Sequence, residues 1–253
     1  MIDIKTQAEI KIMRRGGKIL ELILAELREM IRPGILKIDL EKKAKQLLDK
    51  NKVKPTFLGF RGYPAVSCVS INDEIVHGIP NETKFKDGDL VSVDLGLRYE
   101  GLCLDAAFTK IVGEGDAQNK KLLVVTQNAL KIAIENTRSE VNLGDVQEAI
   151  QFEIEKGGFN AVRDLAGHGI GRELQEEPII LNFGKKGSGP ILKEGMTLAY
   201  EPMVAMGKGN IKVLSDRWTI VTLDGSLNAH FEDTVLVGRD KSESLTGQYK
   251  IKL

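Results

Sequence analysis

The sequence has too few cysteines, and no apolar run long enough, to define a disulfide-rich or membrane-spanning protein. It contains two cysteines, Cys68 and Cys103, which are too few for a disulfide framework and lack the spacing of metal ligands. No apolar run approaches the length of a membrane span, and the N-terminus is amphipathic rather than a signal peptide. These absences predict a protein of the reducing cytoplasm with no membrane partner.

The chain also lacks an excess of charge of either sign. Lysine plus arginine number 36, and aspartate plus glutamate also number 36, so no basic surplus indicates nucleic acid binding. A local charged patch is still compatible with this balance. With 253 residues, 42% of them hydrophobic, the chain has enough apolar side chains for a large core in one domain or two.

Residues 90–110 contain the central motif, two alternating apolar and polar segments that predict a β-hairpin carrying Asp94 and Asp105. If Tyr99 and Glu100 form a two-residue loop, Asp94 faces Asp105, with Cβ atoms roughly 4.5–5.5 Å apart. The same register pairs Leu95 with Leu104 and Leu97 with Leu102. Two carboxylates this close repel unless a proton or a cation lies between them. The hairpin therefore predicts a cation site, and two solvent-facing aspartates are the alternative.

Apolar periodicity predicts four helices, at about 6–31, 39–50, 117–138 and 144–156. Thr6 and Glu9 form a capping box at the start of the first helix, and Pro33 and Gly34 end it. Short strands and turns are expected at 57–77, and further strands after 156. The order of elements in the first half therefore recurs in the second.

A repeat is also visible in the letters of the sequence. Residues 32–50 align with 138–156 at a constant offset of 106, which pairs Asp39 with Asp145. Chance similarity between two amphipathic helices is the alternative. In a true repeat, each half supplies helices to one joined antiparallel sheet, and a site between the halves draws ligands from both.

The second half contains three candidate ligands for such a site. His168 lies between two glycines in residues 167–171, Glu201 follows an apolar run, and Glu232 precedes a strand-like segment. Alone, the histidine is more often packed or exposed, and each glutamate is more often salt-bridged or at a strand end. Together with the two aspartates, they suit a pair of divalent transition ions better than a structural zinc.

Several motifs together resemble the type I methionine aminopeptidases over nearly the whole chain. They are Gly-Tyr-Pro at 62–64, Cys-Val-Ser-Ile-Asn at 68–72, His-Gly-Ile-Pro at 77–80, Gly-His-Gly-Ile-Gly at 167–171 and Glu-Pro-Met at 201–203, besides the two aspartates and Glu232. The resemblance implies one α/β domain, residues 1–253, with the "pita-bread" fold. Its pseudo-twofold halves, about 5–112 and 116–238, share an antiparallel sheet covered by two helix pairs. With no zinc-finger extension before Thr6, the chain resembles the short bacterial form.

The resemblance also implies an activity and its cofactors. A protein of this family removes the N-terminal methionine from nascent proteins and peptides, with two divalent ions (iron, manganese, cobalt or zinc) and a hydroxide between them as nucleophile. It implies a monomer acting in the cytoplasm near the ribosome, without nucleic acid or membrane partners.

Site residues follow from the same resemblance, by motif position. Asp94 would bind one ion, and Asp105 and Glu232 would bridge both. His168 and Glu201 would complete the second ion's ligands, with Glu201 also accepting a proton. His77 would hydrogen-bond near the scissile amide of the substrate. The methionine pocket would be lined by Phe57, Phe60, Tyr63, Cys68, Leu174 and Trp218, which without the resemblance are ordinary core residues.

One position departs from the family in the catalytic machinery. The family normally has a second active-site histidine where this chain has Gln175, and His230 is not an obvious substitute. Glutamine donates a hydrogen bond to substrate but delivers no proton, which predicts an active, slowed enzyme. Leu174 stands where the family commonly has phenylalanine, and Phe57 and Phe60 stand where smaller or hydroxylated residues are common. The alternatives are a peptidase that cleaves before proline and a non-catalytic pita-bread binding protein.

Overall fold

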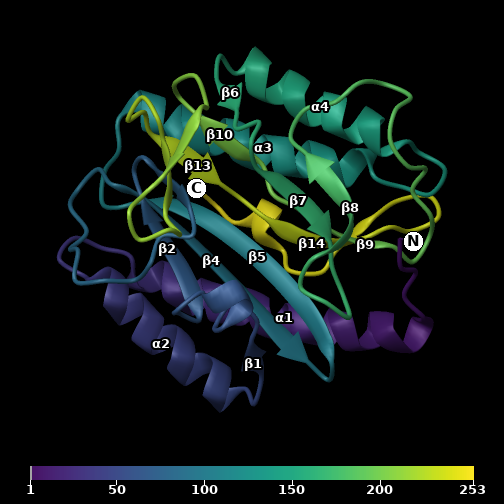
Figure 1. The fold of residues 1–253 in the computed structure, drawn as a ribbon, viewed down its shortest axis with the longest axis horizontal. Helices are drawn as coiled ribbons and strands as arrows, with labels where there is room; N and C mark the ends of the chain where they lie inside the picture. Colours follow the sequence, from purple (N-terminus) through teal and green to yellow (C-terminus); the bar gives the residue numbers. More distant parts are fainter. Residues whose placement is uncertain (1) are drawn as a thin grey trace.

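The computed structural model describes residues 2–253 and places four long helices around antiparallel sheets (Figure 1). The helices are α1 (Gln7–Met30), α2 (Lys37–Lys50), α3 (Ala117–Asn136) and α4 (Leu143–Lys156). All four predicted helices are confirmed, with shifts of at most two residues at their ends. The capping box is also present, since the Thr6 hydroxyl accepts the N–H of Glu9 and the Glu9 carboxylate accepts the N–H of Thr6.

The strands are short apart from the central hairpin. They are β1 (Lys54–Pro55), β2 (Ser67–Ile71), β3 (Glu74–Val76), β4 (Leu90–Tyr99), β5 (Leu102–Ile111), β6 (Asn160–Ala161), β7 (Ala166–Gly169), β8 (Glu176–Leu181), β9 (Thr197–Tyr200), β10 (Met203–Ala205), β11 (Ile211–Val213), β12 (Ile220–Thr222), β13 (Asn228–His230), β14 (Asp233–Leu236) and β15 (Glu243–Ser244). One sheet has the order β1-β4-β2 with β5 on β4, and another has the order β15-β14-β9-β7-β8. All the strand pairings are antiparallel.

Each half of the chain supplies one pair of helices to the sheets. In Figure 1, α1 and α2 lie along the half that holds β2, β4 and β5, while α3 and α4 lie along the other half. The buried face of α1, which includes Met13, Leu20 and Leu24, packs on β4 and β5. Gly16 of α1 lies against Leu104 of β5, so α1 covers the face of the hairpin opposite to the one that carries Asp105.

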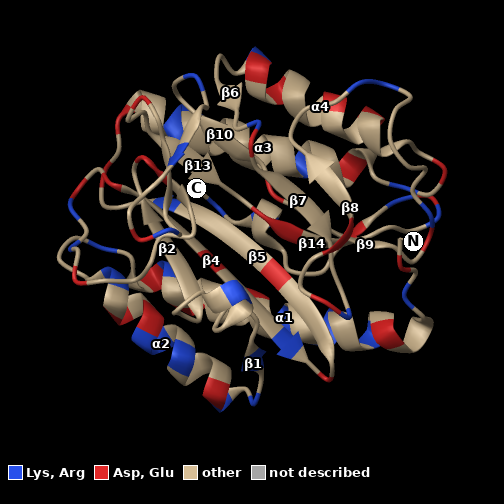
Figure 2. Cartoon of the chain, viewed as in Figure 1, with Lys and Arg blue, Asp and Glu red and all other residues tan. Residues whose placement is uncertain are grey.

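Charged residues are spread over the helices and loops of both halves. Figure 2 shows blue and red segments alternating along α1 and α2, mainly red segments along α4, and acidic segments within the central strands β5 and β14. Within residues 2–253, none of the helices is apolar over a length that could cross a bilayer.

The turn of the central hairpin lies one residue later than predicted. Tyr99 pairs with Leu102, so the two-residue loop is Glu100–Gly101 rather than Tyr99–Glu100. Both loop residues have positive φ, 46° and 90°. Positive φ at both central residues is the type I′ conformation, whose twist matches that of the flanking strands, and glycine adopts it without a steric cost.

This register moves the two aspartates out of direct opposition. Asp94 lies across from Ala107 and Asp105 lies across from Gly96, so the predicted pairing of the two aspartates is wrong. The shift is an even number of residues, which keeps both carboxylates on the same face of the sheet. Diagonal neighbours about 7–8 Å apart remain within reach of long or polar side chains. The apolar pairs shift in the same way, to Leu95 with Ala106 and Leu97 with Leu104.

The two halves contain matching backbone hydrogen bonds at, or within one residue of, the offset of 106 seen in the sequence. α4 begins and ends 106 positions after α2. At the helix starts, the N–H of Lys37 donates to the carbonyl of Thr83, and the N–H of Leu143 donates to the carbonyl of Pro190. We propose that the repeats extend over about 5–112 and 116–238, because the shared hydrogen bonds lie inside these bounds.

The halves meet at a backbone bridge between Ala107 and Glu232. The N–H of Ala107 donates to the carbonyl of Glu232 at 3.3 Å, and the N–H of Glu232 donates to the carbonyl of Ala107 at 2.8 Å. On either side of the bridge, β5 pairs with β4, and β14 pairs with β9. The bridge therefore brings the strands of the two repeats together at one place.

Candidate metal centre

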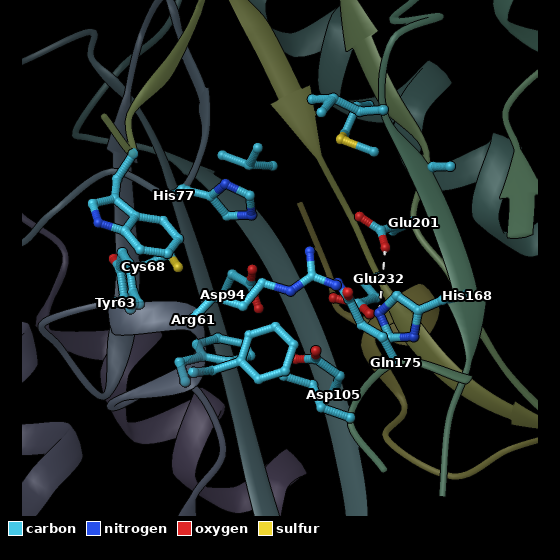
Figure 3. Close-up of a pocket in the computed structure, with 18 residues that line it drawn as sticks. Arg61, Tyr63, Cys68, His77, Asp94, Asp105, His168, Gln175, Glu201 and Glu232 are labelled. Carbon is cyan, nitrogen blue, oxygen red and sulfur yellow. Dashed lines mark ion pairs between the residues drawn. The ribbon is translucent and has the colours of Figure 1, made fainter. Parts of the chain in front are cut away.

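One cavity of about 220 Å³ collects all the site residues expected from the sequence. Its lining includes Phe57, Phe60, Tyr63, Cys68, His77, Asp94, Asp105, His168, Leu174, Gln175, Glu201, Trp218 and Glu232. Figure 3 shows His168, Glu201 and Glu232 on one side, Tyr63 and Cys68 on the other, and Asp94 between them. The cavity thus joins a polar cluster to an apolar wall.

The polar cluster draws on both halves of the chain. Asp94 and Asp105 come from the hairpin strands β4 and β5, His168 from β7, and Glu201 and Glu232 from the residues next to β9 and β14. Ligand atoms of Asp105, His168 and Glu232 all lie within 4.8 Å of one another. These three side chains alone could hold one metal ion.

Gly96 makes room for the carboxylate of Asp105. A Cβ at position 96 would lie 2.1 Å from the Thr56 hydroxyl and 3.3 Å from Asp105 Oδ1. The Asp105 side chain therefore lies close over the backbone of the neighbouring strand. The N–H of Ala106 donates to the same Oδ1 atom at 3.0 Å and fixes the orientation of the carboxylate.

His168 is held so that its outer nitrogen faces the cluster. Its Nδ1 lies 2.8 Å from the carbonyl of Gly169, a contact that requires a proton on Nδ1 and leaves the lone pair of Nε2 free for a metal. The two glycines beside it allow other chain segments to approach, since Cβ atoms at Gly167 and Gly169 would lie about 2 Å from the carbonyl oxygens of Ala199 and Glu177. The motif therefore packs strands closely around the imidazole.

Burial makes the four carboxylates of the cluster costly to ionise. It raises the pKa of Asp94 to about 7. Burial and the charges of neighbouring acids raise the pKa of Asp105, Glu201 and Glu232 well above the ordinary carboxyl range. Buried Asp94 Oδ1 and Glu232 Oε1 have no hydrogen-bond partner within residues 2–253. A cation would relieve both the repulsion and the missing contacts.

The donor set fits divalent metal ions. Four carboxylates and one imidazole are hard to intermediate ligands, which suit first-row transition ions, and no thiolate of the kind that structural zinc prefers lies in the cluster. Cys68 is on the apolar wall, and burial raises the pKa of its thiol. We conclude that the residues present are suited to hold metal.

His77 lies at the cavity away from His168 (Figure 3). Its backbone has a φ of 58°, a strained conformation for a non-glycine residue that neighbouring structure must enforce. Its ring is edge-on to Trp218, with centroids 6.4 Å apart. Burial lowers the pKa of the imidazole, which favours the neutral ring near pH 7.

The six predicted pocket residues belong to one apolar cluster separate from the main core. Phe57, Tyr63, Cys68 and Leu174 are buried in it, and Phe60 and Trp218 pack against it. Tyr63 and Trp218 meet edge to face at 5.2 Å, and the Tyr63 hydroxyl lies 3.2 Å from the carbonyls of Ser67 and Gly78. The cluster forms an apolar, aromatic wall of the cavity, and its role as a methionine pocket stays a prediction.

The segment that carries Leu174 and Gln175 is held by a buried ion pair. Lys5 Nζ lies 2.5 Å from Glu176 Oε2, and the side chains are 1% and 9% exposed. Glu176 Oε1 accepts the N–H of Glu173, which closes the turn around residues 174 and 175. The Lys5 stem also fills the space beside Gly171. The N-terminal arm therefore helps to set one wall of the cavity.

Replacing Lys5 by methionine is expected to lower the free energy of unfolding by about 3–5 kcal/mol, because Glu176 would keep a buried charge without its partner. Chemical denaturation measures this loss. Arg14→Met is the matched control, since the Arg14–Glu243 pair is 2.7 Å long but 45% exposed, and exposed pairs contribute about 0–1 kcal/mol. Equal losses in the two variants would contradict a special role for Lys5.

Two residues at the site were missed by the sequence prediction. Arg61 is the one lysine or arginine among the cavity-lining residues, and it lies in the turn at residues 59–62 (Figure 3). His230 is 1% exposed, and its Nε2 lies 3.7 Å from Glu201 Oε2. Burial lowers the pKa of His230 to about 3, with a further contribution from His77. The only sequence signal for His230 was its position two residues before Glu232.

Comparisons with known proteins show which proteins the chain resembles over its length. Residues 11–239 match the model of metallopeptidase family M24. The chain is 43% identical to the methionine aminopeptidase of Clostridium perfringens, over 97% of this chain and 99% of the relative. It is 41% identical to methionine aminopeptidase 1 of Bacillus subtilis, with the same coverage.

Solved structures show the same fold. The methionine aminopeptidase of Thermotoga maritima matches with a TM-score of 0.96 and 48% identity, over 97% of this chain and 99% of that one. The prolidase of Pyrococcus furiosus matches with a TM-score of 0.80 and 23% identity, over 99% of this chain and 66% of that one. At that identity the prolidase shares the fold only. The predicted pita-bread fold is confirmed.

Proposed function

The chain belongs to metallopeptidase family M24, and we propose that it removes the N-terminal methionine from nascent proteins and peptides. It is a metallo-aminopeptidase, a hydrolase. The observation that carries the proposal is one cavity in which converging metal ligands lie beside an aromatic and thiol-lined wall. A methionine side chain on that wall would place its own carbonyl at the ligand cluster.

We propose that Asp94, Asp105, His168, Glu201 and Glu232 hold two divalent ions. Iron, manganese, cobalt and zinc all suit these ligands. When bound, such ions act as Lewis acids and lower the pKa of a coordinated water to about 7. The four acids are then balanced by positive charge and can remain ionised.

The other residues would bind substrate and move protons. Glu201 is the proposed proton acceptor, because its carboxylate lies in the cluster beside His168, 3.8 Å from Nε2. His77, neutral near pH 7, would hydrogen-bond to the scissile amide. Gln175 would donate its amide N–H to the substrate carbonyl oxygen as negative charge develops there.

The function is tested by release of methionine from Met-Ala-Ser, measured beside cleavage of an Xaa-Pro peptide and the metal content of protein purified without added metal. We expect metal-dependent release from Met-Ala-Ser and no cleavage before proline. Cleavage of the Xaa-Pro peptide alone would indicate the related peptidase. Metal-free protein that is inert on both peptides would indicate a binding protein.

The two alternative functions are not favoured. The full-length relatives at 41–43% identity are methionine aminopeptidases, and the prolidase match is to only 66% of that chain. A binding protein derived from this fold would be expected to have lost ligands, whereas all five candidates line the cavity. We further propose that a monomer acts in the cytoplasm on chains leaving the ribosome, because nascent N-termini are the substrate.

A further inference from the structure

His230 has a buried nitrogen without a hydrogen-bond partner, directed at a proposed metal ligand. Its Nε2 atom is fully buried and unpartnered within residues 2–253. The nearest carboxylate is that of Glu201, with Oε2 at 3.7 Å. Leaving a buried polar group unpaired costs free energy, so such a group in a native structure calls for an explanation.

The bridge between the halves shows that His230 occupies a position equivalent to that of Asp105, one of the proposed metal ligands. Counted from the Ala107–Glu232 bridge, Asp105 and His230 are each two residues earlier in their own strands. Their surroundings also match. The Thr234 hydroxyl bonds to the backbone N–H and carbonyl of Asp105, and the Thr109 hydroxyl bonds to the backbone N–H and carbonyl of His230. The fold therefore presents both side chains toward the same centre.

The Glu201 carboxylate lies between two imidazoles. Oε1 faces His168 Nε2 at 3.8 Å, and Oε2 faces His230 Nε2 at 3.7 Å. His168 is one of the proposed metal ligands, whereas His230 contacts the other oxygen of the same carboxylate. A shift of under about 1 Å would bring Oε2 and the His230 N–H to hydrogen-bond distance. Contacts at active sites often tighten in this way when ligands bind.

We propose that His230 is a positioning residue, whose Nε2–H hydrogen-bonds to Glu201 Oε2 and fixes the direction in which Oε1 meets the metal. This inference rests on the proposed function and adds a residue outside the five ligands. Partners of this kind typically change metal affinity by about 10- to 100-fold when they are removed. A residue that only fills space would not set the geometry of the metal.

The test compares two amides at position 230. The His230→Gln side chain is long enough to donate an N–H to Glu201, whereas the His230→Asn side chain is one carbon shorter and does not reach it. The measurements are Co²⁺ affinity by calorimetry and the visible absorption spectrum of the Co²⁺ form. We expect about 10- to 100-fold weaker Co²⁺ binding and an altered spectrum for His230→Asn, and values within about threefold of wild type for His230→Gln.

His230→Leu extends the test to a side chain without a donor, and its expected affinity loss equals that of His230→Asn. Melting of each metal-free variant checks that it is folded. Unchanged affinity and spectrum in His230→Asn and His230→Leu, or an equal loss in His230→Gln, would overturn the proposal. Wild-type protein that binds Co²⁺ but leaves Met-Ala-Ser intact would contradict the proposed function without affecting these binding comparisons.

Discussion

Asp105→Asn is expected to lower kcat/KM for a Met-Ala peptide by about 10³-fold or more, while raising the melting temperature of the metal-free protein. Asparagine keeps an oxygen that can accept the N–H of Ala106, so the local backbone contact is preserved. It removes one negative charge from a proposed bridging position. Lewis acid stabilisation worth several kcal/mol is lost when metal binding fails, and each 1.36 kcal/mol is about tenfold in rate.

The gain in melting temperature follows from the burial of the acids. Without metal, Asp105 shares the cavity with Asp94, Glu201 and Glu232, whose charges repel it. Removing one acid relieves this repulsion, and each kcal/mol gained shifts the melting temperature by about 2–4 °C in a protein of this size. Scanning calorimetry without Mn²⁺ measures the change in melting temperature of the metal-free protein, and the same scan with Mn²⁺ measures the stabilisation by metal. We expect added Mn²⁺ to stabilise the wild type and to leave Asp105→Asn unchanged.

Asp233→Asn is the matched control for that experiment. Asp233 is also a buried aspartate next to the centre, but its carboxylate accepts bonds from the Thr246 hydroxyl and the N–H groups of Gln248 and Tyr249. It is absent from the cavity lining. Its replacement is expected to lower the melting temperature and keep stabilisation by Mn²⁺. A lower melting temperature for metal-free Asp105→Asn would contradict the electrostatic account.

Gln175→His is expected to raise kcat/KM for the same peptide by about 10²-fold, the lower end of general acid–base contributions. Gln175 is exposed and lines the cavity, and its side-chain amide can donate a hydrogen bond but cannot transfer a proton to substrate. A histidine at this position could transfer a proton to the substrate. The pH profile of the variant would then gain an ionisation near the ordinary histidine pKa of about 6.5.

Gln175→Leu is the control, because it removes the donor without adding an acid, and its rate is expected to fall below that of the wild type. An unchanged kcat/KM in Gln175→His would show that this position does not limit the reaction. A rise without a change in the pH profile would indicate that the added ring binds substrate rather than transferring a proton.

Local patterns predicted the helices and the face of the hairpin, because capping, periodicity and strand alternation are short-range properties. The register was missed, because it depended on whether Tyr99 or Gly101 joins Glu100 in the two-residue loop with positive φ, and in the folded turn that residue is Gly101. All five proposed ligands line the predicted kind of site, although their individual roles stay predictions.

The sequence did not predict the roles of residues that depend on partners far away in the chain. Lys5 resembles any exposed lysine until Glu176, in the second half of the chain, is placed against it. His230 has no motif of its own, and it comes close to Glu201 through the pairing of β10 with β13 and the hydrogen bonds to Thr109. Tertiary contacts of this kind produce no periodic pattern in the amino-acid sequence.

The bridge between Ala107 and Glu232 has a consequence for biosynthesis. Asp94 and Asp105 are made well before Glu232, so a growing chain on the ribosome has two of the proposed ligands before the residue that bridges the halves has emerged. Contacts so far apart in sequence form late and slowly. The proposed set of five ligands is therefore incomplete in a growing chain until Glu232 has been added and has folded against the hairpin.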